Sequence, residues 1–119
     1  MYPSGAWRGY WEQRGWGRQP MDDLVLFFSG GTVRGEGRDV IGRFTFAGTY
    51  DSQGHVALTK QYLGRHRVHY QGTYDSEGTI FGHWSIGPQL SGRFALSPVA
   101  EMDVADEPIH EIVPAPSPA

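Results

Sequence analysis

The sequence predicts an all-β protein: a closed eight-stranded antiparallel up-and-down barrel with an irregular C-terminal tail. Short runs of β-branched and aromatic residues recur every 8 to 12 positions between clusters of Gly, Asp and Ser, and no window shows the apolar stripe of an amphipathic helix. The connections are short, so neighbouring runs should pair antiparallel. Eight strands in an open sheet would leave two long edges, and closure removes them.

Turn-forming segments rich in Gly, Asp and Ser separate the strands. Segments 29–31, 51–54 and 75–78 are examples, and their residue types favour the backbone conformations of tight turns. The predicted strands span residues 6–14, 21–28, 32–38, 43–50, 55–62, 66–74, 79–86 and 92–97. We therefore expect the barrel domain at residues 1–98 and a separate tail at residues 99–119.

Successive side chains on a strand point to opposite faces, so alternation assigns the interior. Strand by strand, the side chains expected inside are Trp7, Gly9, Trp11; Leu24, Leu26, Phe28; Val33, Gly35, Gly37; Phe44, Phe46, Gly48, Tyr50; Val56, Leu58, Lys60, Tyr62; His66, Val68, Tyr70, Gly72, Tyr74; Ile80, Gly82, Trp84, Ile86; Phe94 and Leu96. The inward glycines either allow the strands to bend or leave space for a ligand.

An internal repeat supports the hairpin pattern. The segment Gly48-Thr-Tyr-Asp-Ser-Gln-Gly54 returns as Gly72-Thr-Tyr-Asp-Ser-Glu-Gly78, and six of the seven residues match in order. Each copy fits a short link with Gly in the left-handed conformation, in a hairpin that carries a bulge. One hairpin unit therefore occurs twice.

Polar residues on the interior face are the strongest local signal of a site. If Leu63-Gly-Arg65 is a three-residue link, Tyr62 pairs with His66 and Lys60 with Val68, which places Lys60, Tyr62 and His66 at one end of the barrel. A buried lysine needs a partner, and desolvation lowers its pKa. Three roles remain open for Lys60: a rim residue that reaches water or pairs with Asp39, a polar anchor for a ligand, or a catalytic base.

Composition and charge exclude several classes of protein. The chain has 119 residues, no Cys and a net charge of -3, and the five acids of residues 99–119 leave the rest close to neutral. This body lacks the basic stripe of a nucleic-acid-binding protein. No apolar run approaches the roughly 20 residues of a membrane span, and the start of the chain does not resemble a signal peptide. We expect a cytoplasmic protein with no nucleic-acid or membrane partner.

No motif indicates a cofactor, a metal or an assigned catalytic residue. The histidines are predicted on different faces, so three of them should not meet at one metal ion. The glycine-rich segment 30–37 superficially suggests phosphate binding, but no helix follows it. The expectation is no metal and no cofactor, with catalytic residues unknown.

Two short segments and the strand pattern resemble a known class of barrel. Trp7-Arg-Gly-Tyr10 on the first strand and Gly82-His-Trp84 on a late strand, together with eight short meander strands, resemble the small calycin barrels, avidin-like, streptavidin-like or lipocalin-like. The segment from Lys60 to Tyr70 also resembles uncharacterised bacterial barrel proteins. The calycin resemblance covers residues 6–97 at the level of architecture. It implies a small ligand in the barrel mouth, held by aromatic side chains and a few polar groups.

The leading functional hypothesis is the binding of a small apolar or aromatic molecule inside the barrel. The residues expected to bind it are Lys60, Tyr62, His66, Asp39, Trp11, Tyr50, Tyr70 and Trp84. The first alternative is an isomerase- or cyclase-type enzyme in which Lys60, Tyr62 or His66 moves a proton. The second is a protein-interaction module.

An apolar patch on the outer face motivates that second alternative. Tyr10, Val25, Phe27, Phe81 and Ala95 are predicted on the outside of the first, second, seventh and eighth strands, where closure of the barrel would join them. Patches of this kind mark contacts. We expect the patch to be covered by the tail or by a second copy of the chain, and a homodimer is the preferred arrangement.

Overall fold

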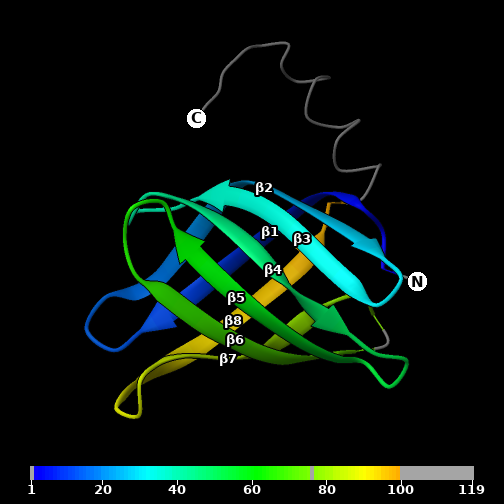
Figure 1. Ribbon diagram of the computed structural model, residues 1–119. Coiled ribbons are helices and arrows are strands. Elements are labelled where there is room, and N and C mark those ends of the chain that lie inside the picture. Colours follow the sequence, from blue (N-terminus) through cyan, green and yellow to red (C-terminus); the bar gives the residue numbers. More distant parts are fainter. Residues whose placement is uncertain (1, 76, 100–119) are drawn as a thin grey trace.

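The structure is a computed structural model that describes residues 2–75 and 77–99, and these residues form one closed antiparallel barrel (Figure 1). Its strands are β1 (Gly5–Gln13), β2 (Gly17–Ser29), β3 (Thr32–Arg38), β4 (Arg43–Tyr50), β5 (His55–Tyr62), β6 (Arg67–Tyr74), β7 (Ile80–Ile86) and β8 (Leu90–Pro98). Each strand pairs with the next one, and β8 closes the barrel against β1 with Ala95 opposite Tyr10. The predicted fold class is confirmed.

The first hairpin is longer than expected. β2 begins at Gly17, whereas the sequence predicted a strand from residue 21, and Pro20 lies within β2 although proline cannot donate to a neighbouring strand. In the structure Pro20 lies opposite Tyr10, and the link is residues 14–16. The register of β2 against β3 shifts between Asp22 and Val25, where Asp23 has a φ of 53°. Proline is therefore accommodated within a hairpin that β-bulges bend.

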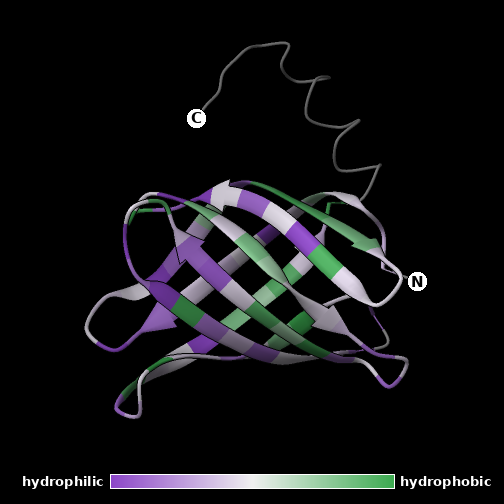
Figure 2. Cartoon of the chain, in the orientation of Figure 1, coloured by the Kyte–Doolittle hydropathy of each residue, from purple (hydrophilic) through white to green (hydrophobic). Residues whose placement is uncertain are grey.

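The hydrophobic core occupies the inside of the barrel. Apolar and polar residues alternate along the strands, as the bands of colour in Figure 2 show. Five of the aromatic residues expected inside the barrel are all 4% exposed or less. They are Trp7, Trp11, Phe46, Tyr70 and Trp84. The predicted inward phase is therefore confirmed for these residues.

The inward glycines mark close approaches between strands. A Cβ atom on Gly48 would overlap the carbonyl oxygen of Ala57 on β5, and one on Gly82 would overlap that of Gln71 on β6. Backbone of the neighbouring strand occupies the space that a side chain would need. Of the two explanations open at the sequence level, strand curvature holds at these positions and space for a ligand does not.

The links of an up-and-down barrel alternate between its two ends. One end, here the closed end, carries links 30–31, 51–54 and 75–79. The other, here the open end, carries links 14–16, 39–42, 63–66 and 87–89 and lies on the left in Figure 1. Chemistry-bearing residues far apart in sequence can therefore meet at one end.

The closed end is covered by the N-terminal segment. The Tyr2 ring stacks on Phe28 with centroids 4.8 Å apart and contacts the rings of Tyr50 and Tyr74. The Trp7 indole nitrogen donates a hydrogen bond to the carbonyl of Pro3 at 2.8 Å. This segment seals the closed end with a hydrophobic aromatic cluster.

The repeated sequence forms two equivalent turns at the closed end. Asp51 Oδ1 accepts hydrogen bonds from the amides of Gln53 and His55, both at 2.9 Å. In the second copy, Asp75 Oδ1 accepts the amides two and four residues later in the same way. Gly54 and Gly78 both have positive φ, which agrees with the predicted left-handed glycine.

β8 ends at Pro98. Apart from Val99, the expected tail lies outside the described residues, and so does its expected contact with the outer face. The part of the chain that the structure describes contains no helix that is long and apolar enough to cross a membrane.

Candidate functional site: the open end of the barrel

A buried ion pair lies near the open end. Lys60 projects inward from β5 and is 0% exposed, and its Nζ lies 2.7 Å from Asp39 Oδ2. Asp39 belongs to the link between β3 and β4, and its side chain is also fully buried. The same ammonium group donates to the Tyr70 hydroxyl at 3.2 Å. The pairing of Lys60 with Asp39 that the sequence left open is present, and it occurs inside the barrel.

Neutral donors complete the surroundings of the Asp39 carboxylate. Oδ2 accepts a hydrogen bond from the Tyr62 hydroxyl at 2.8 Å and one from the Trp11 indole at 3.0 Å. Oδ1 accepts the amides of Ile41 at 2.9 Å and Gly42 at 3.4 Å. A buried ion pair is tolerated when such hydrogen bonds replace water. The link between β3 and β4 is therefore held to the barrel interior by its own carboxylate.

Aromatic rings surround the ammonium group of Lys60. Nζ lies 4.3 Å from the centroid of the Phe44 ring and 4.8 Å from that of Tyr62. Phe46, Tyr70 and Trp11 place further rings within about 6 Å. Ring faces attract cations, most strongly where water is excluded.

Burial changes the ionisation of the cluster. It lowers the pKa of Lys60 from 10.5 to about 8, although the charge of Asp39 and its hydrogen bond act in the opposite direction. Burial raises the pKa of Tyr62 far above its ordinary value, and the hydrogen bond to Asp39 adds to this. Burial, followed by the charge of Asp39, also raises the pKa of Tyr70. Both phenols therefore keep their protons, and Tyr62 donates its own to Asp39.

A small cavity adjoins this cluster and opens toward the links of the open end. Its volume is about 50 Å³, and it is lined by Trp11, Gln13, Ile41, Tyr62, His66, Val68, Tyr70, Trp84 and Ile86. Trp84 is fixed by a hydrogen bond from its indole to the Glu12 carbonyl at 3.0 Å and by edge-on contact with Trp11. Lys60 is not among the lining residues. The cavity wall is therefore largely aromatic, and Tyr70 is the lining residue that is hydrogen-bonded to Lys60 of the ion pair.

The Tyr70 hydroxyl has an unused hydrogen. Its oxygen accepts from Lys60, and within residues 2–75 and 77–99 no atom accepts the hydrogen that it carries. The side chain is fully buried. A buried donor without an acceptor is unfavourable unless something else accepts it. Since Tyr70 lines the cavity, an acceptor placed there would satisfy this donor.

Most of the residues expected to bind a ligand gather here. Tyr62, Tyr70, Trp11 and Trp84 line the cavity, and Lys60 and Asp39 lie behind it. The predicted pairing is confirmed: the Tyr62 amide donates to the His66 carbonyl at 3.2 Å, and Lys60 lies opposite Val68. His66 itself precedes β6 and is exposed, at the mouth of the cavity. Whether these side chains bind a ligand stays a prediction.

Tyr50 does not belong to this group. β4 begins at the open end and finishes with Tyr50 at the closed end, where its ring contacts Tyr2 and Phe28. Alternation predicts which face a side chain occupies, but it does not give its height along the barrel. Tyr50 is therefore not brought together with the other expected ligand-binding residues, and its binding role stays a prediction.

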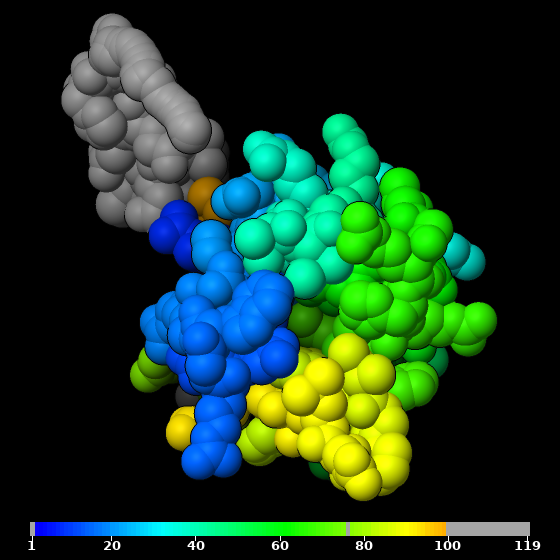
Figure 3. Space-filling model, turned by 90° about the vertical axis from the view of Figure 1, so that its left-hand side faces the viewer, coloured from blue at the N-terminus to red at the C-terminus, as the bar shows by residue number. Residues whose placement is uncertain are grey.

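The open end also carries four exposed apolar side chains in or next to its links, which the sequence analysis did not predict. Trp16, Val40, Leu63 and Leu90 are exposed, and each lies in or next to a different link of this end. Figure 3, which views the molecule from the open end, shows the four hairpins grouped around it. The Trp16 ring lies 6.0 Å from that of Trp11, centroid to centroid. The signal was a large apolar residue in or next to every odd-numbered link.

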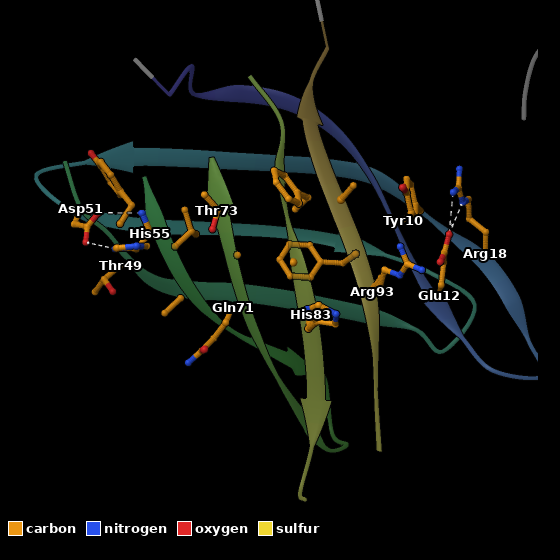
Figure 4. Close-up of a pocket in the computed structure, with 18 residues that line it drawn as sticks. Tyr10, Glu12, Arg18, Thr49, Asp51, His55, Gln71, Thr73, His83 and Arg93 are labelled. Atoms are coloured by element: carbon orange, nitrogen blue, oxygen red, sulfur yellow. Dashed lines mark hydrogen bonds and ion pairs between the residues drawn. The ribbon is translucent and has the colours of Figure 1, made fainter. Parts of the chain in front are cut away.

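A second concavity lies on the outer wall, across β1, β8, β7, β6, β5 and β4, and has a volume of about 1280 Å³ (Figure 4). Its polar side chains are largely paired at its two extremes: Arg18 with Glu12 at 2.9 Å, and His55 with Asp51 at 3.1 Å. Between them lie Arg93, His83, Phe81 and small side chains. These groups do not converge on one point, so the open end is the better candidate.

The outer apolar patch is divided rather than continuous. Tyr10, Ala95 and Phe81 lie side by side across β1, β8 and β7, as predicted. Val25 lies opposite Ala6 instead, and the Arg8 and Ser97 pair separates the two groups. A bulge in β1 and the strand register cause this separation. The prediction of one patch is therefore wrong, although all five side chains are on the outside.

No family model matches the sequence, and no curated protein matches it.

Among the described residues, no group of three His, Asp or Glu side chains could hold a metal ion.

Proposed function

We propose that the protein binds a small molecule at the open end, through one apolar or aromatic group that carries a hydrogen-bond acceptor. The observation that carries this proposal is the unused hydroxyl hydrogen of buried Tyr70 on an aromatic cavity wall. Ligand sites combine apolar walls with a few well-placed polar groups. The cavity has this composition.

The ion pair orients and polarises the Tyr70 hydroxyl. Lys60 donates to the oxygen of that hydroxyl, so its hydrogen must point away from the ammonium group. A hydroxyl that accepts from a cation is polarised and donates more strongly. Asp39 holds Lys60 in place at 2.7 Å. Lys60 and Asp39 are thus positioning residues, and Tyr70 is the ligand contact.

The size of the cavity limits the ligand. A volume of about 50 Å³ is a third of the roughly 150 Å³ that encloses a benzene ring in an engineered cavity. A ring therefore enters only in part, or it displaces a side chain such as Ile86, and the rest of the ligand lies among the exposed link residues. The resemblance to calycin barrels, which implies a ligand in the mouth, supports the same end of the molecule.

Two one-ring compounds of similar shape test the proposal. Acetophenone carries a carbonyl acceptor, and isopropylbenzene does not, so saturation-transfer NMR should detect tighter binding of acetophenone. Tyr70→Phe should remove that preference, which corresponds to roughly 1 kcal/mol for one hydrogen bond. Tyr50→Phe at the closed end is the matched control and should retain it. Failure of both compounds to bind the wild type, or an unchanged preference in Tyr70→Phe, would contradict the proposal.

An isomerase- or cyclase-type enzyme is the second candidate because the pKa of Lys60, lowered to about 8, suits proton transfer. Lys60 does not line the cavity, so the proton would pass through the Tyr70 hydroxyl. The same NMR samples in D₂O test this function. Exchange of the acetophenone methyl protons that depends on Tyr70 would support an enzyme, and an unchanged methyl signal would favour binding alone.

A further inference from the structure

The open end carries exposed apolar side chains on all four of its hairpins. Trp16 is 51% exposed, Val40 64%, Leu63 58% and Leu90 41%. The other exposed large hydrophobic residues among those described, Phe27 and Phe81, lie on the outer wall, and the closed-end links carry none. Four exposed apolar side chains therefore lie in or next to the four links of one end, whose hairpins Figure 3 shows grouped together.

The same end is rich in arginine. Arg14 and Arg65 lie in its links, and Arg43 and Arg67 begin the strands that follow two of them. The side chains of Arg14, Arg43 and Arg65 form no hydrogen bond or ion pair with any residue that the structure describes. Closed-end links instead contain the acids Asp51, Asp75 and Glu77 and neither Lys nor Arg.

Acidic groups near the open end are mostly neutralised. Asp39 is buried against Lys60, and Glu12 and Asp23 form ion pairs with Arg18 and Arg38. Asp22 is exposed beside Asp23 on β2. The rim, defined as Trp16, Val40, Leu63 and Leu90 with Arg14, Arg43, Arg65 and Arg67, therefore presents apolar tips within a positive field.

We propose that this rim docks on the surface of an anionic lipid bilayer. Trp favours the interfacial layer, Leu and Val side chains enter the acyl boundary, and arginines bind lipid phosphates and carboxylates. The tips come from four separate turns at one end, so all can enter a flat layer together. A second copy placed end to end would oppose arginine with arginine, which disfavours it. The charge of the rim selects the anionic surface as its occupant.

This inference does not depend on the proposed ligand in the cavity. It also differs from the expectation of no membrane partner, which depended on the lack of an apolar span. A span is required to cross a bilayer but not to rest on its surface. The docking residues lie in the links, whereas Tyr70 and its cavity lie below them.

Vesicle binding measured by tryptophan fluorescence tests the proposal. Trp7, Trp11 and Trp84 are buried, so Trp16 is the only exposed tryptophan of the chain. With phosphatidylcholine vesicles that contain about 30% phosphatidylserine, we expect a blue shift and less quenching by acrylamide. Neutral phosphatidylcholine vesicles should give a much smaller effect, and raising the salt from about 0.05 M to about 0.5 M should weaken binding.

Matched variants locate the contact. Val40→Ser and Leu63→Ser should each weaken vesicle binding, by roughly tenfold if the side chain is largely buried in lipid. Arg14→Gln and Arg65→Gln should reduce the preference for anionic vesicles. Phe27→Ser and Arg34→Gln remove an exposed phenylalanine and an exposed arginine from the wall, and both should bind as the wild type does.

Three results would overturn the proposal. They are no binding to phosphatidylserine vesicles, equal binding to neutral vesicles, and rim variants that bind as tightly as the wild type. Sedimentation without lipid tests the other occupant. A dimer that becomes a monomer in Leu63→Ser would assign the rim to a second copy of the chain.

Discussion

The two ends of the barrel are both lined with aromatic side chains, but they are completed by opposite kinds of chemistry. At the closed end, Tyr2 from the N-terminal segment fills the space between Phe28, Tyr50 and Tyr74. At the open end, a lysine and an aspartate from β5 and a link occupy the corresponding place. The closed end is therefore sealed by local hydrophobic packing, and the open end by a long-range polar network.

The difference teaches how one fold separates stability from recognition. Hydrophobic packing needs no directed partners, so a short terminal segment can supply it. The polar network needs specific donors, and it holds Trp11, Tyr62 and Tyr70 in defined positions around Asp39 and Lys60. A buried ion pair contributes little net stability compared with hydrophobic residues of the same size. Its value at the open end is the fixed geometry of the cavity wall.

Removal of the Lys60 ammonium group should have the largest effect on stability. Lys60→Met removes the amine that donates to Asp39 and Tyr70, two hydrogen bonds that a deprotonated lysine would keep, and truncating one partner of a buried ion pair costs roughly 3 to 5 kcal/mol. Chemical unfolding measures the loss. Lys60→Met/Asp39→Asn removes both charges and keeps an acceptor oxygen, so it should be less destabilised than the single variant. A loss below about 1 kcal/mol in Lys60→Met would mean that water reaches Asp39 and that the open end is not sealed.

At the closed end, truncation of Tyr2 should have the next largest effect. Tyr2→Ala removes a mostly buried ring, and we expect a loss of roughly 3 kcal/mol in the free energy of unfolding. Tyr2→Phe keeps the ring and removes a hydroxyl that is buried without a partner. It should therefore leave the protein unchanged or stabilise it by up to about 1 kcal/mol. Destabilisation by Tyr2→Phe would show that the closed end, too, depends on a polar contact.

Alkaline titration should distinguish the two ends. Burial lowers the pKa of Lys60 to about 8, so between pH 8 and pH 10 the unfolded chain binds more protons than the folded chain. The free energy of unfolding should therefore rise with pH in this window, by at most about 1.4 kcal/mol per pH unit, and the contribution of Lys60 should become independent of pH below 8. Above pH 10, the raised pKa values of Tyr2, Tyr62 and Tyr70 should reverse the slope.

A single NMR signal measures the pKa of Lys60 directly. Lys60 is the only lysine of the chain, so ¹³C-labelled lysine gives one Cε resonance. We expect its chemical shift to titrate near pH 8, together with the rise in stability. A midpoint near 10.5 would place Lys60 in contact with solvent and would remove the distinction between the ends.

The length of a link predicted more about which residues meet at the open end than the amino-acid composition did. A three-residue link at 63–65 was enough to place Tyr62 beside His66 and Lys60 opposite Val68, because antiparallel register follows from the turn. Height along the barrel does not follow from alternation, which is why Tyr50 was grouped with residues that lie at the other end. Odd- and even-numbered links of a meander lie at opposite ends. Applied to β4, this rule would have placed Tyr50 away from the Lys60 cluster.

Two further features depend on packing that a linear pattern does not contain. Tyr2 precedes the first strand, and its position over the closed end depends on rings from β2, β4 and β6. The cavity depends on how closely Trp11, Tyr70 and Trp84 pack, and aromatic residues that fill a barrel or leave a gap have the same alternation. Shape complementarity among side chains decides such features.

The smallest expected effect is that of the rim on stability. Val40 and Leu63 are more than half exposed, so Val40→Ser and Leu63→Ser should change the free energy of unfolding by no more than about 0.5 kcal/mol. Leu58→Ser, a buried position on β5, is the contrasting control and should cost several times more. If the rim variants lost more than about 1 kcal/mol, their apolar side chains would belong to the packing of the open end and would need no partner to explain them. Near-neutral rim variants would leave the exposed apolar side chains without a role in folding, and a contact with another surface would then be the physical reason for their presence.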